Sequence, residues 1–490
     1  MSEARVRPVG ARPVPSAGLS GNWEGVDPVL RRIYVSRGVT DKSELDYALG
    51  GLLPVSSLSG VEAAVSLLRE HADRRITIVG DFDADGATST ALVIRCLRAF
   101  GFAQVDYIVP NRFKFGYGLT PEIVAVAAER SPDLLITVDN GVSSVDGVEA
   151  AHAAGIKVLV TDHHLPGEVL PAADAMVNPN LPDCEFGSPN LAGVGVAFYV
   201  MAALGRALEA DGKAGCARVP AKYLDLVALG TVADVVRLDM NNRILVEQGL
   251  KRIRAGHAVP GIAALFRQAG RSMTRAVSTD LGFAAGPRLN AAGRLEDMSI
   301  GIECLLTDDH GAADRFAEAL DSINKERKDI EARMRQEAFA YVDAMDASDL
   351  PACICLYDEQ WHQGVVGLIA ARVRERCDRP VIAFARESDG MLKGSARSIP
   401  GVHVRDLLEA VSTRSPGLIQ RFGGHAMAAG LTMKDDHFDR FAELAADCLL
   451  TLYPGADFSG AIATDGPLPA ESLALPFARV LRGAGPWGAG

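Results

Sequence analysis

The sequence predicts an α/β protein in which an open, mostly parallel sheet is joined by a long helix to a second, smaller α/β domain. In the first half of the chain, short β-rich runs alternate with longer segments of helical periodicity, and a polar cluster follows each of four runs. Between Ala312 and Tyr341, apolar residues recur at helical spacing beside a charged face, as in a long helix. Strand and helix units in alternation form a parallel sheet with helices on both faces, which gives the fold class.

Four strands are expected in the first sheet, at residues 76–79, 105–109, 134–138 and 157–160. The helices expected between them run from Thr88 to Phe100, over "LTPEIVAVAAER" and from Ser144 to Ala154. In the middle one, Thr120 can cap the helix and Pro121 takes its first position. Ligands of such sheets bind at the carboxyl ends of the strands, so the four polar clusters should face one crevice.

The rest of the chain predicts a helical region, which includes "LDLVALGTVADVVRL", and then a second α/β unit. In that unit, "ACICLY", "PVIAFA" and "LKGSARSI" are expected strands, and "GVVGLIAARVRERC" and Phe438 to Leu450 are expected helices. We expect an N-terminal arm and lead-in (1–45), a catalytic domain with a helical part (46–305), a connecting helix (306–348) and a substrate-binding domain (349–455). Residues 456–490 would start a further domain, and the glycine-rich end means either that this domain is truncated or that this relative lacks it.

The composition is that of a globular protein, with 48% hydrophobic and 23% charged residues among 490. The net charge of −12 argues against a generally basic nucleic-acid-binding surface but leaves room for a local basic groove. Eight cysteines include no CxxC pair, so a zinc knuckle is not indicated. No apolar stretch approaches the ~18 residues of a membrane span. The first residues are rich in Pro, Ala and Arg and are expected to form a flexible arm. They lack the apolar core of a secretory signal peptide. We therefore expect a cytoplasmic protein that contacts no membrane.

Three aspartates follow the first expected strand in "DFDADG": Asp81, Asp83 and Asp85. A calcium-binding EF-hand loop would need a preceding helix and a Glu at its twelfth position, where Leu92 stands. The nucleophile motif of a haloacid dehalogenase would have Thr or Val four residues after its first aspartate, where this chain has Asp85. Unpaired, such a cluster would repel itself, so a bound cation is the economical explanation.

Further ligand candidates follow the third and fourth strands: Asp139, then the triplet Asp162, His163 and His164. Carboxylate and imidazole without thiolate favour Mn²⁺ or Mg²⁺. The ligands suffice for two ions that share one aspartate, which we assign to Asp139 because its strand lies between the others in sequence order. Asp234, alone in an apolar helical segment, is a further ligand or else a helix cap. Two such ions activate water at phosphorus, which predicts hydrolysis of a phosphate ester or anhydride.

Several motifs together resemble those of a known family. "DFDADG", "VDNG" and "TDHH" are similar to successive motifs of the DHH phosphoesterase superfamily, and "RFGGHAMAAG" resembles the signature of its companion DHHA1 domain. Within that superfamily, "VPNRFKFGYGL", "ALGTVADVVRL", "GPRLNAAGR" and "KGSARS" resemble the bacterial RecJ family of exonucleases specific for single-stranded DNA. The resemblance extends from roughly Ile76 to Gly430, and its specificity comes from the joint order of the motifs.

The resemblance implies an enzyme that uses Mn²⁺ or Mg²⁺ to degrade single-stranded DNA from its 5′ end to mononucleotides, in recombination and repair. It implies that the metal-site residues are Asp81, Asp83, Asp85, Asp139, His163 and Asp234. His164 would lie beside the scissile phosphate, and Asp162 would orient the histidines. A helicase and a single-strand-binding protein would be partners. Members of the family usually continue into an oligonucleotide-binding β-barrel.

Other residues could hold the end of the strand. Ser395 and Arg397 in "SARS" offer a hydroxyl and a forked guanidinium to a terminal 5′ phosphate, and Arg112 could share this role. For any single arginine the alternative is a surface salt bridge.

Three residues of "GPRLNAAGR" could line the path of the DNA: Arg288, Asn290 and Arg294. The two arginines would contact phosphates. Tyr117 and Phe113 could stack on bases or pack in the core. Gly423 and Gly424 could let the backbone approach a phosphate, with His425 as a hydrogen-bond donor. Alternatively, these glycines could form a tight interdomain turn.

Three other functions share parts of this pattern. An oligoribonuclease or cyclic-dinucleotide phosphodiesterase of the same superfamily shares the metal chemistry but resembles shorter chains without "VPNRFKFGYGL" and "GPRLNAAGR". A pyrophosphatase would need a lysine- and arginine-rich pocket, which the sequence does not reveal. A non-catalytic nucleic-acid-binding scaffold, such as a degenerate subunit of the eukaryotic replicative helicase, tolerates lost ligands, whereas every acidic position is filled here.

Overall fold

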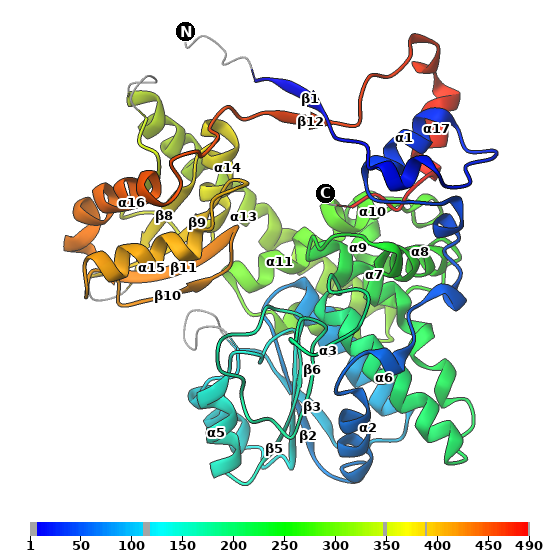
Figure 1. Ribbon diagram of the computed structural model, residues 1–490. Coiled ribbons are helices and arrows are strands. Elements are labelled where there is room, and N and C mark those ends of the chain that lie inside the picture. The colour runs from blue at the N-terminus through cyan, green and yellow to red at the C-terminus, as the bar shows by residue number, and fades with distance from the viewer. Residues whose placement is uncertain (1–6, 111–117, 346–349, 388–389, 489–490) are drawn as a thin grey trace. The chain divides into compact units, whose positions relative to one another are not determined.

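The computed structural model describes residues 7–110, 118–345, 350–387 and 390–488. The chain divides into two compact units (Figure 1). The large unit contains Pro13–Asn324 and Pro467–Gly490, and the small unit contains Met1–Arg12 and Lys325–Gly466. A parallel sheet in the large unit and a mixed sheet in the small unit confirm the predicted α/β fold class.

The sheet of the large unit has five parallel strands in the order β3-β2-β4-β5-β6. They are β2 (Ile76–Gly80), β3 (Val105–Ile108), β4 (Leu134–Val138), β5 (Lys157–Thr161) and β6 (Ala175–Val177). The four strands that the sequence predicts are all present. The edge strand β6 was not expected, because its three residues are too few to show a period.

Helices cover both faces of this sheet. One face packs against α2 (Val61–Glu70), α3 (Ala84–Ala99) and α6 (Gly193–Ala210), and the other against α4 (Pro121–Ala128) and α5 (Val145–Ala153). Every residue of β2 and β4 is therefore buried, as in other sheets covered on both sides. Thr120 caps α4 as predicted, since its Oγ1 accepts a hydrogen bond from the Ile123 amide at 3.4 Å.

Helix α3 begins at Ala84 and not at the expected Thr88. Asp83 caps it, because its Oδ1 accepts hydrogen bonds from the amides of Asp85 and Gly86 at 2.9 and 3.0 Å. The polar cluster after β2 thus forms the first turn of a helix. Its carboxylates are held by that turn and do not lie in a loose loop.

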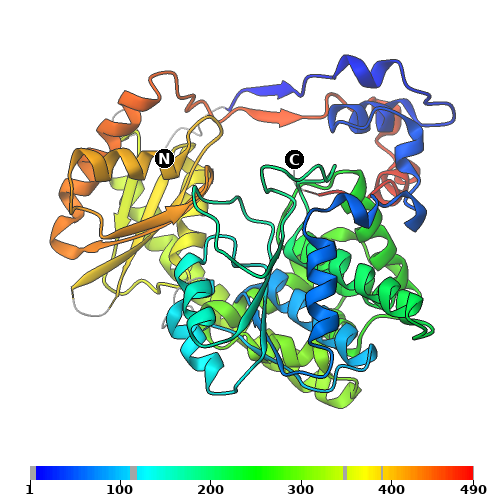
Figure 2. The same cartoon turned by 60° about the horizontal axis from the view of Figure 1, so that its bottom comes forward.

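A helical part completes the large unit. It comprises α7 (Leu224–Ala233), α8 (Met240–Arg254), α9 (Pro260–Gln268), α10 (Ser278–Asp280), a π-helical turn (Leu281–Ala285), α11 (Gly286–Leu295) and α12 (Ser299–Leu306). Near the ends of the chain, α1 (Pro28–Ser36) and α17 (Leu475–Gly483) lie side by side (Figures 1 and 2). Tyr34 stacks on Trp487 at 5.5 Å between ring centroids. The predicted long helix is α13 (His310–Ala344), which runs from the large unit into the small one.

Helix α6 corrects one expectation. Among the described residues, it is long and apolar enough to cross a membrane by length and composition, which the sequence analysis did not find. However, 67% of its 18-residue stretch is buried inside the structure. The bent pair Leu49–Ser57 and α2 passes the same test only when counted as one span. Helix α6 is therefore accounted for as a core helix of the large unit.

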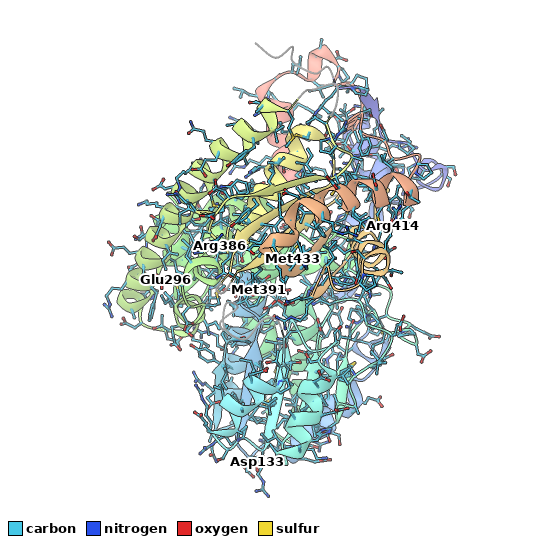
Figure 3. All side chains as sticks on the ribbon, turned by 90° about the vertical axis from the view of Figure 1, so that its left-hand side faces the viewer. Asp133, Glu296, Arg386, Met391, Arg414 and Met433 are labelled. Carbon is cyan, nitrogen blue, oxygen red and sulfur yellow. The ribbon has the colours of Figure 1, made fainter. Side chains whose placement is uncertain are left out.

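The small unit has a mixed five-stranded sheet in the order β10-β11-β9-β8-β7. Its strands are β7 (Ile354–Tyr357), β8 (Val381–Arg386), β9 (Met391–Arg397), β10 (Arg421–Gly424) and β11 (Ala428–Lys434). Only β7 and β8 pair in parallel. Arg386, Met391 and Met433, labelled in Figure 3, lie on the adjacent strands β8, β9 and β11. Helix α14 (Val366–Cys377) packs on β8 and β9, and α15 (Val404–Arg414) and α16 (Phe438–Leu452) share the core of the unit.

Two pairings of the small unit were not foreseen. The glycine-rich segment that was given no strand forms the antiparallel pair β10 and β11. Within the N-terminal arm, β1 (Val9–Ala11) pairs in parallel with β12 (Ile462–Thr464), and the two strands run side by side in Figure 2. Backbone pairing with a distant partner holds this part of the arm, and such a partner leaves no local signal in the sequence.

Candidate metal centre

Polar side chains from three neighbouring strands meet at the carboxyl edge of the parallel sheet. Asp81 follows β2, Asp139 follows β4 and Asp162 follows β5, and β4 lies between the other two strands. Parallel strands all end at the same edge, so the fold brings these residues together as predicted. Asp81, Asp139 and Asp162 are all buried.

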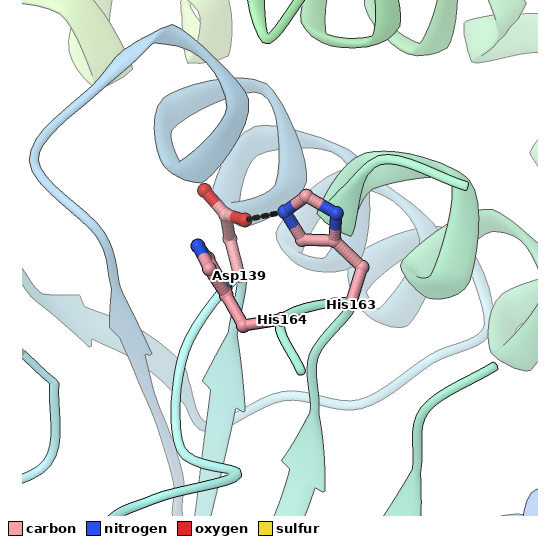
Figure 4. Close-up of side chains that lie close together, drawn as sticks. All are labelled: Asp139, His163 and His164. Carbon is pink, nitrogen blue, oxygen red and sulfur yellow. Dashed lines mark ion pairs between the residues drawn. The ribbon is translucent and has the colours of Figure 1, made fainter. Parts of the chain in front are cut away.

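His163 lies at the centre of the group. Its Nε2 lies 3.1 Å from Oδ1 of Asp139, 3.6 Å from Oδ2 of Asp234 and 4.0 Å from Oδ2 of Asp85. Figure 4 shows the imidazole turned toward the Asp139 carboxylate, with the His164 ring on the same side of the strand. The structure thus brings carboxylates from the end of β4, from α3 and from the end of α7 around one imidazole nitrogen, and the imidazole itself follows β5.

Asp234 is the residue that ends α7. A carboxylate at this position lies at the negative end of the helix dipole, where it destabilises the helix, so capping does not explain it. Its side chain approaches His163 instead. The helix-cap alternative from the sequence analysis therefore receives no support from this geometry.

Three groups of side chains place one donor atom each within 4.8 Å of one another: Asp81 with Asp83 and Asp139, Asp85 with His163 and Asp234, and Asp139 with His163 and His164. Asp139 and His163 each belong to two of these groups. The arrangement is compatible with two ions that share Asp139. All these donors are oxygen or imidazole nitrogen, which suits Mn²⁺ or Mg²⁺.

Electrostatics show that this donor set fits a cation. Burial raises the pKa of Asp85 well above its usual range, and repulsion from Asp234 and Asp83 raises it further. Burial, and then Asp85 and its neighbours, raise the pKa of Asp139 in the same way. Burial lowers the pKa of His163 to about 4, which keeps its imidazole neutral and able to bind a metal. A divalent cation would offset the repulsion that these buried groups otherwise carry.

Asp162 holds the two histidines rather than joining the cluster. Its Oδ1 accepts hydrogen bonds from the amides of His163 and His164 and lies 2.7 Å from Nδ1 of His164, while its Oδ2 accepts from Val142 at 2.8 Å. Burial alone would lower the pKa of His164, but the hydrogen bond to Asp162 and the negative charges of Asp162, Asp81 and Asp234 together outweigh it and raise that pKa to about 9. His164 is therefore an imidazolium at neutral pH.

This pair predicts a pH dependence of stability in the metal-free protein. His164 is charged up to about pH 9 when folded but only to about 6.5 when unfolded, so its stabilisation is complete below pH 6.5 and is lost as pH rises through 9. Between pH 7 and 9.5, the free energy of unfolding should fall by about 2 kcal/mol more in the wild type than in His164→Gln. Denaturant unfolding in EDTA measures both slopes, and equal slopes would contradict the pairing.

The backbone at the centre is strained. Asp139 has φ of 63° and Val235, next to Asp234, has φ of 65°. Aspartate tolerates this left-handed region better than most residues, whereas a β-branched valine is a marked exception. Such conformations cluster at functional sites, where the surrounding structure imposes them.

Several residues that support the centre were missed by sequence reasoning. The amides of Gly193 and Val194 donate to Asp85 Oδ2 and Oδ1 at 2.6 and 2.9 Å. The Asn178 side chain donates a hydrogen bond to the His164 carbonyl at 2.8 Å, and the Asn180 side chain donates one to the His163 carbonyl at 2.6 Å. The available signals were the paired glycines that open the apolar run "GVGVAF" and the asparagines of "VNPN".

The residues expected to line the DNA path have partners within the large unit. The Arg288 guanidinium donates to the carbonyl of Ala284 and pairs with the largely buried Asp321 at 2.6 Å. Asn290 accepts a hydrogen bond from the Ala84 amide at 2.8 Å, and so supports the start of α3. Arg294 lies in the last turn of α11. These contacts give Arg288 and Asn290 positioning roles whether or not they also contact DNA.

The small unit brings Ser395 and Arg397 together on β9. Arg397 Nη1 donates to Ser395 Oγ at 3.1 Å, and a β carbon at Gly367 would lie 2.9 Å from both Arg397 Nη2 and Ser395 Oγ. Both side chains thus lie against the first turn of α14, whose amides favour anions.

The other expected substrate contacts fall in two places. Gly423, Gly424 and His425 form the end of β10 and the turn into β11, where the His425 amide donates to Ala428. Arg112, Phe113 and Tyr117 lie outside the described residues.

Comparison with known proteins gives consistent results. Residues 75–231 match the DHH family, N-terminal domain, and residues 350–451 match the DHHA1 domain. The chain is 54% identical to the single-stranded-DNA-specific exonuclease RecJ of Dickeya dadantii over 473 residues, which are 95% of this chain and 82% of that protein. Its identity to the same-named protein of Escherichia coli is 52% over 469 residues, 94% and 81% of the two chains.

Solved structures show the same likeness. RecJ of Thermus thermophilus in complex with Mn²⁺ has a TM-score of 0.81 and 32% identity, over 100% of this chain and 68% of that one. An exonuclease RecJ bound to manganese has a TM-score of 0.69 and 33% identity, over 83% and 97%. A complex of the Thermus protein with Mg²⁺ has a TM-score of 0.74.

Proposed function

Because the chain belongs to the RecJ family of single-stranded-DNA-specific exonucleases, with DHH and DHHA1 domains, we propose that it hydrolyses single-stranded DNA from the 5′ end to mononucleotides. The observation that carries the proposal is the converging set of buried carboxylates and imidazole at the edge of the sheet. The related structures with Mn²⁺ and Mg²⁺ support these ions as cofactors.

The proposed ligands are those that the resemblance indicates: Asp81, Asp83, Asp85, Asp139, His163 and Asp234. When bound, two such ions would activate a water and stabilise charge on the attacking and leaving oxygens. Asp139 would be shared by the two ions, which is supported by its place in the donor group of Asp81 and Asp83 and by its distance of 3.1 Å from His163, a member of the donor group of Asp85 and Asp234. Neutral His163 offers its Nε2 as a ligand without a proton to displace.

His164 is proposed to bind the scissile phosphate. Its imidazolium can donate a hydrogen bond from Nε2 to a phosphate oxygen, because Nδ1 already engages Asp162. Asp162 in turn fixes the ring through contacts to both histidine amides. Asp162 therefore has a positioning role. It keeps His164 charged, and the charged His164 is the residue proposed to contact the substrate.

A terminal 5′ phosphate is proposed to bind in the small unit at Ser395 and Arg397. The guanidinium donates to the hydroxyl at 3.1 Å, and both groups lie close against Gly367 in the first turn of α14. Arg112 remains a proposed contact to the same 5′ phosphate. The proposed contacts along the strand remain Tyr117, Arg288, Asn290, Arg294, Gly423, Gly424 and His425. We propose residues 46–305 as the catalytic domain and 349–455 as the substrate-binding domain.

The test is digestion with Mn²⁺ of single-stranded DNA labelled at either end, beside a duplex and a short RNA. We expect immediate release of a 5′ label as mononucleotide, with the duplex untouched. Arg397→Ala should lower the preference for a 5′ phosphate over a 5′ hydroxyl by about ten-fold or more, because a charge-assisted contact is lost. Lys393→Ala, four residues before Arg397 on the same face of β9, is the matched control.

Other outcomes have definite meanings. Release of a 3′ label first would overturn the polarity, and preference for short RNA would favour the oligoribonuclease alternative. An unchanged end preference in Arg397→Ala would move the phosphate site elsewhere. We also propose a cytoplasmic location and, by family analogy, a helicase and a single-strand-binding protein as partners.

A further inference from the structure

Phe283 has the most exposed large hydrophobic side chain among the described residues, at 80% of its surface. A buried phenylalanine gains about 2 to 3 kcal/mol from the hydrophobic effect, which this one forgoes. Its neighbours Leu281, Ala284 and Ala285 are buried. The segment itself is therefore packed, and only the aromatic ring is left in water.

Phe283 lies at the middle of the π-helical turn Leu281–Ala285. Such wide turns are rare and are frequent at functional sites, because they re-aim a side chain within a helix. This turn leads directly into α11, whose Asn290 supports the first turn of α3. The unusual backbone and the unusual exposure coincide at one residue.

The turn packs against the part of α7 that precedes the metal centre. A β carbon at Gly282 would lie 3.2 Å from Val232 Cγ1, and one at Gly286 would lie 3.0 Å from Ala233 Cβ. Asp234, a member of the donor cluster, comes next in the chain. The strained Val235 that follows is itself 65% exposed. Exposed apolar surface thus adjoins the metal centre on two segments that touch each other.

We propose that Phe283 stacks on an unpaired base of the strand held at the metal centre, with Val235 as an apolar neighbour. The inference rests on the proposed function, since a strand whose phosphodiester lies at the donor cluster would run beside the exposed apolar surface that adjoins Asp234. Every base has a π-face, so stacking gives no sequence preference. Bases of a duplex are already stacked and paired, so Phe283 also selects for single strands.

The experiment uses a strand with one abasic position, labelled with different fluorophores at its two ends and digested with Mn²⁺. In the wild type, the abasic position should cause a pause at one fixed product length, with that step slowed about ten-fold or more. Phe283→Ala should digest normal strands more slowly and show no added pause at that length. Phe283→Tyr should keep the pause. Leu475→Ala, which removes another exposed apolar side chain, on α17, should behave as the wild type.

Each contrary result is distinct. A pause that persists in Phe283→Ala, or a wild type without any pause, would overturn the stacking role and leave the surface to a protein partner. Digestion from the 3′ end would overturn the proposed polarity, while the second label would still report the pause and decide the role of Phe283.

Discussion

Asp139→Asn is expected to abolish hydrolysis, with kcat lower by about 10³-fold or more, while the fold is retained. Asp139 belongs to the donor group of Asp81 and Asp83 and lies 3.1 Å from His163 of the other group, so its loss should affect both proposed ions. Asparagine tolerates the φ of 63° at this position and has nearly the same shape. The variant therefore removes charge and ligand strength without forcing the backbone to move.

Stability should change in the opposite direction from activity. Burial and neighbouring aspartates raise the pKa of Asp139, so its charge is costly in the absence of metal. Without metal, Asp139→Asn should unfold at a higher temperature than the wild type, because its free energy of unfolding should be about 1 to 2 kcal/mol higher. Mn²⁺ should stabilise the wild type much more than the variant.

Rates and melting temperatures in EDTA and in Mn²⁺ provide the test. Asp146→Asn, at an exposed aspartate in the first turn of α5, is the control and should leave both unchanged. Retained cleavage by Asp139→Asn would refute its assignment as a ligand. An equal Mn²⁺ stabilisation of variant and wild type would place the ions elsewhere.

Gly193→Ala is expected to lower activity by about 10²-fold, although it alters no ligand. A β carbon at Gly193 would lie 2.6 Å from both Cβ and Oδ1 of Asp139, closer than any real contact allows. The same residue donates its amide to Asp85 Oδ2 at 2.6 Å. Either Asp139 or the start of α6 must shift, and both hold the donor cluster in place.

Gly195→Ala on the same helix is the matched control. Its β carbon would meet only the flexible end of the Leu191 side chain, at 2.9 Å. We expect a modest loss of stability and little change in kcat. Comparable activity loss in both variants would show that α6 as a whole, and not the approach of Gly193 to Asp139, is responsible.

The strands and the clustering of acidic residues at one edge of the sheet could be predicted because the information is local. Each strand is a buried apolar run, and the aspartates follow such runs directly. A parallel sheet then brings Asp139 and Asp162 to one edge without further knowledge. Asp234 was harder, because only the packing of α7 in the folded unit brings it to His163.

The supporting contacts could not be predicted, because they depend on which segments approach each other. Nothing near Gly193 in the sequence indicates that Asp139 will lie against it. Arg288 stays a proposed phosphate contact, and its ion pair with Asp321 from another helix left no signal in the sequence. Strand β10 shows few apolar positions, because glycines occupy half of it.

The pairing of β1 with β12 sets an order of assembly. The Gly10 carbonyl accepts a hydrogen bond from Thr464 Oγ1, 454 residues further on. At the pace of translation this separation corresponds to a wait on the order of a minute. All the proposed ligands precede residue 235, so the large unit can begin to collapse around them while the first strand still has no partner. Strand β1 is thus synthesised long before the strand that it pairs with.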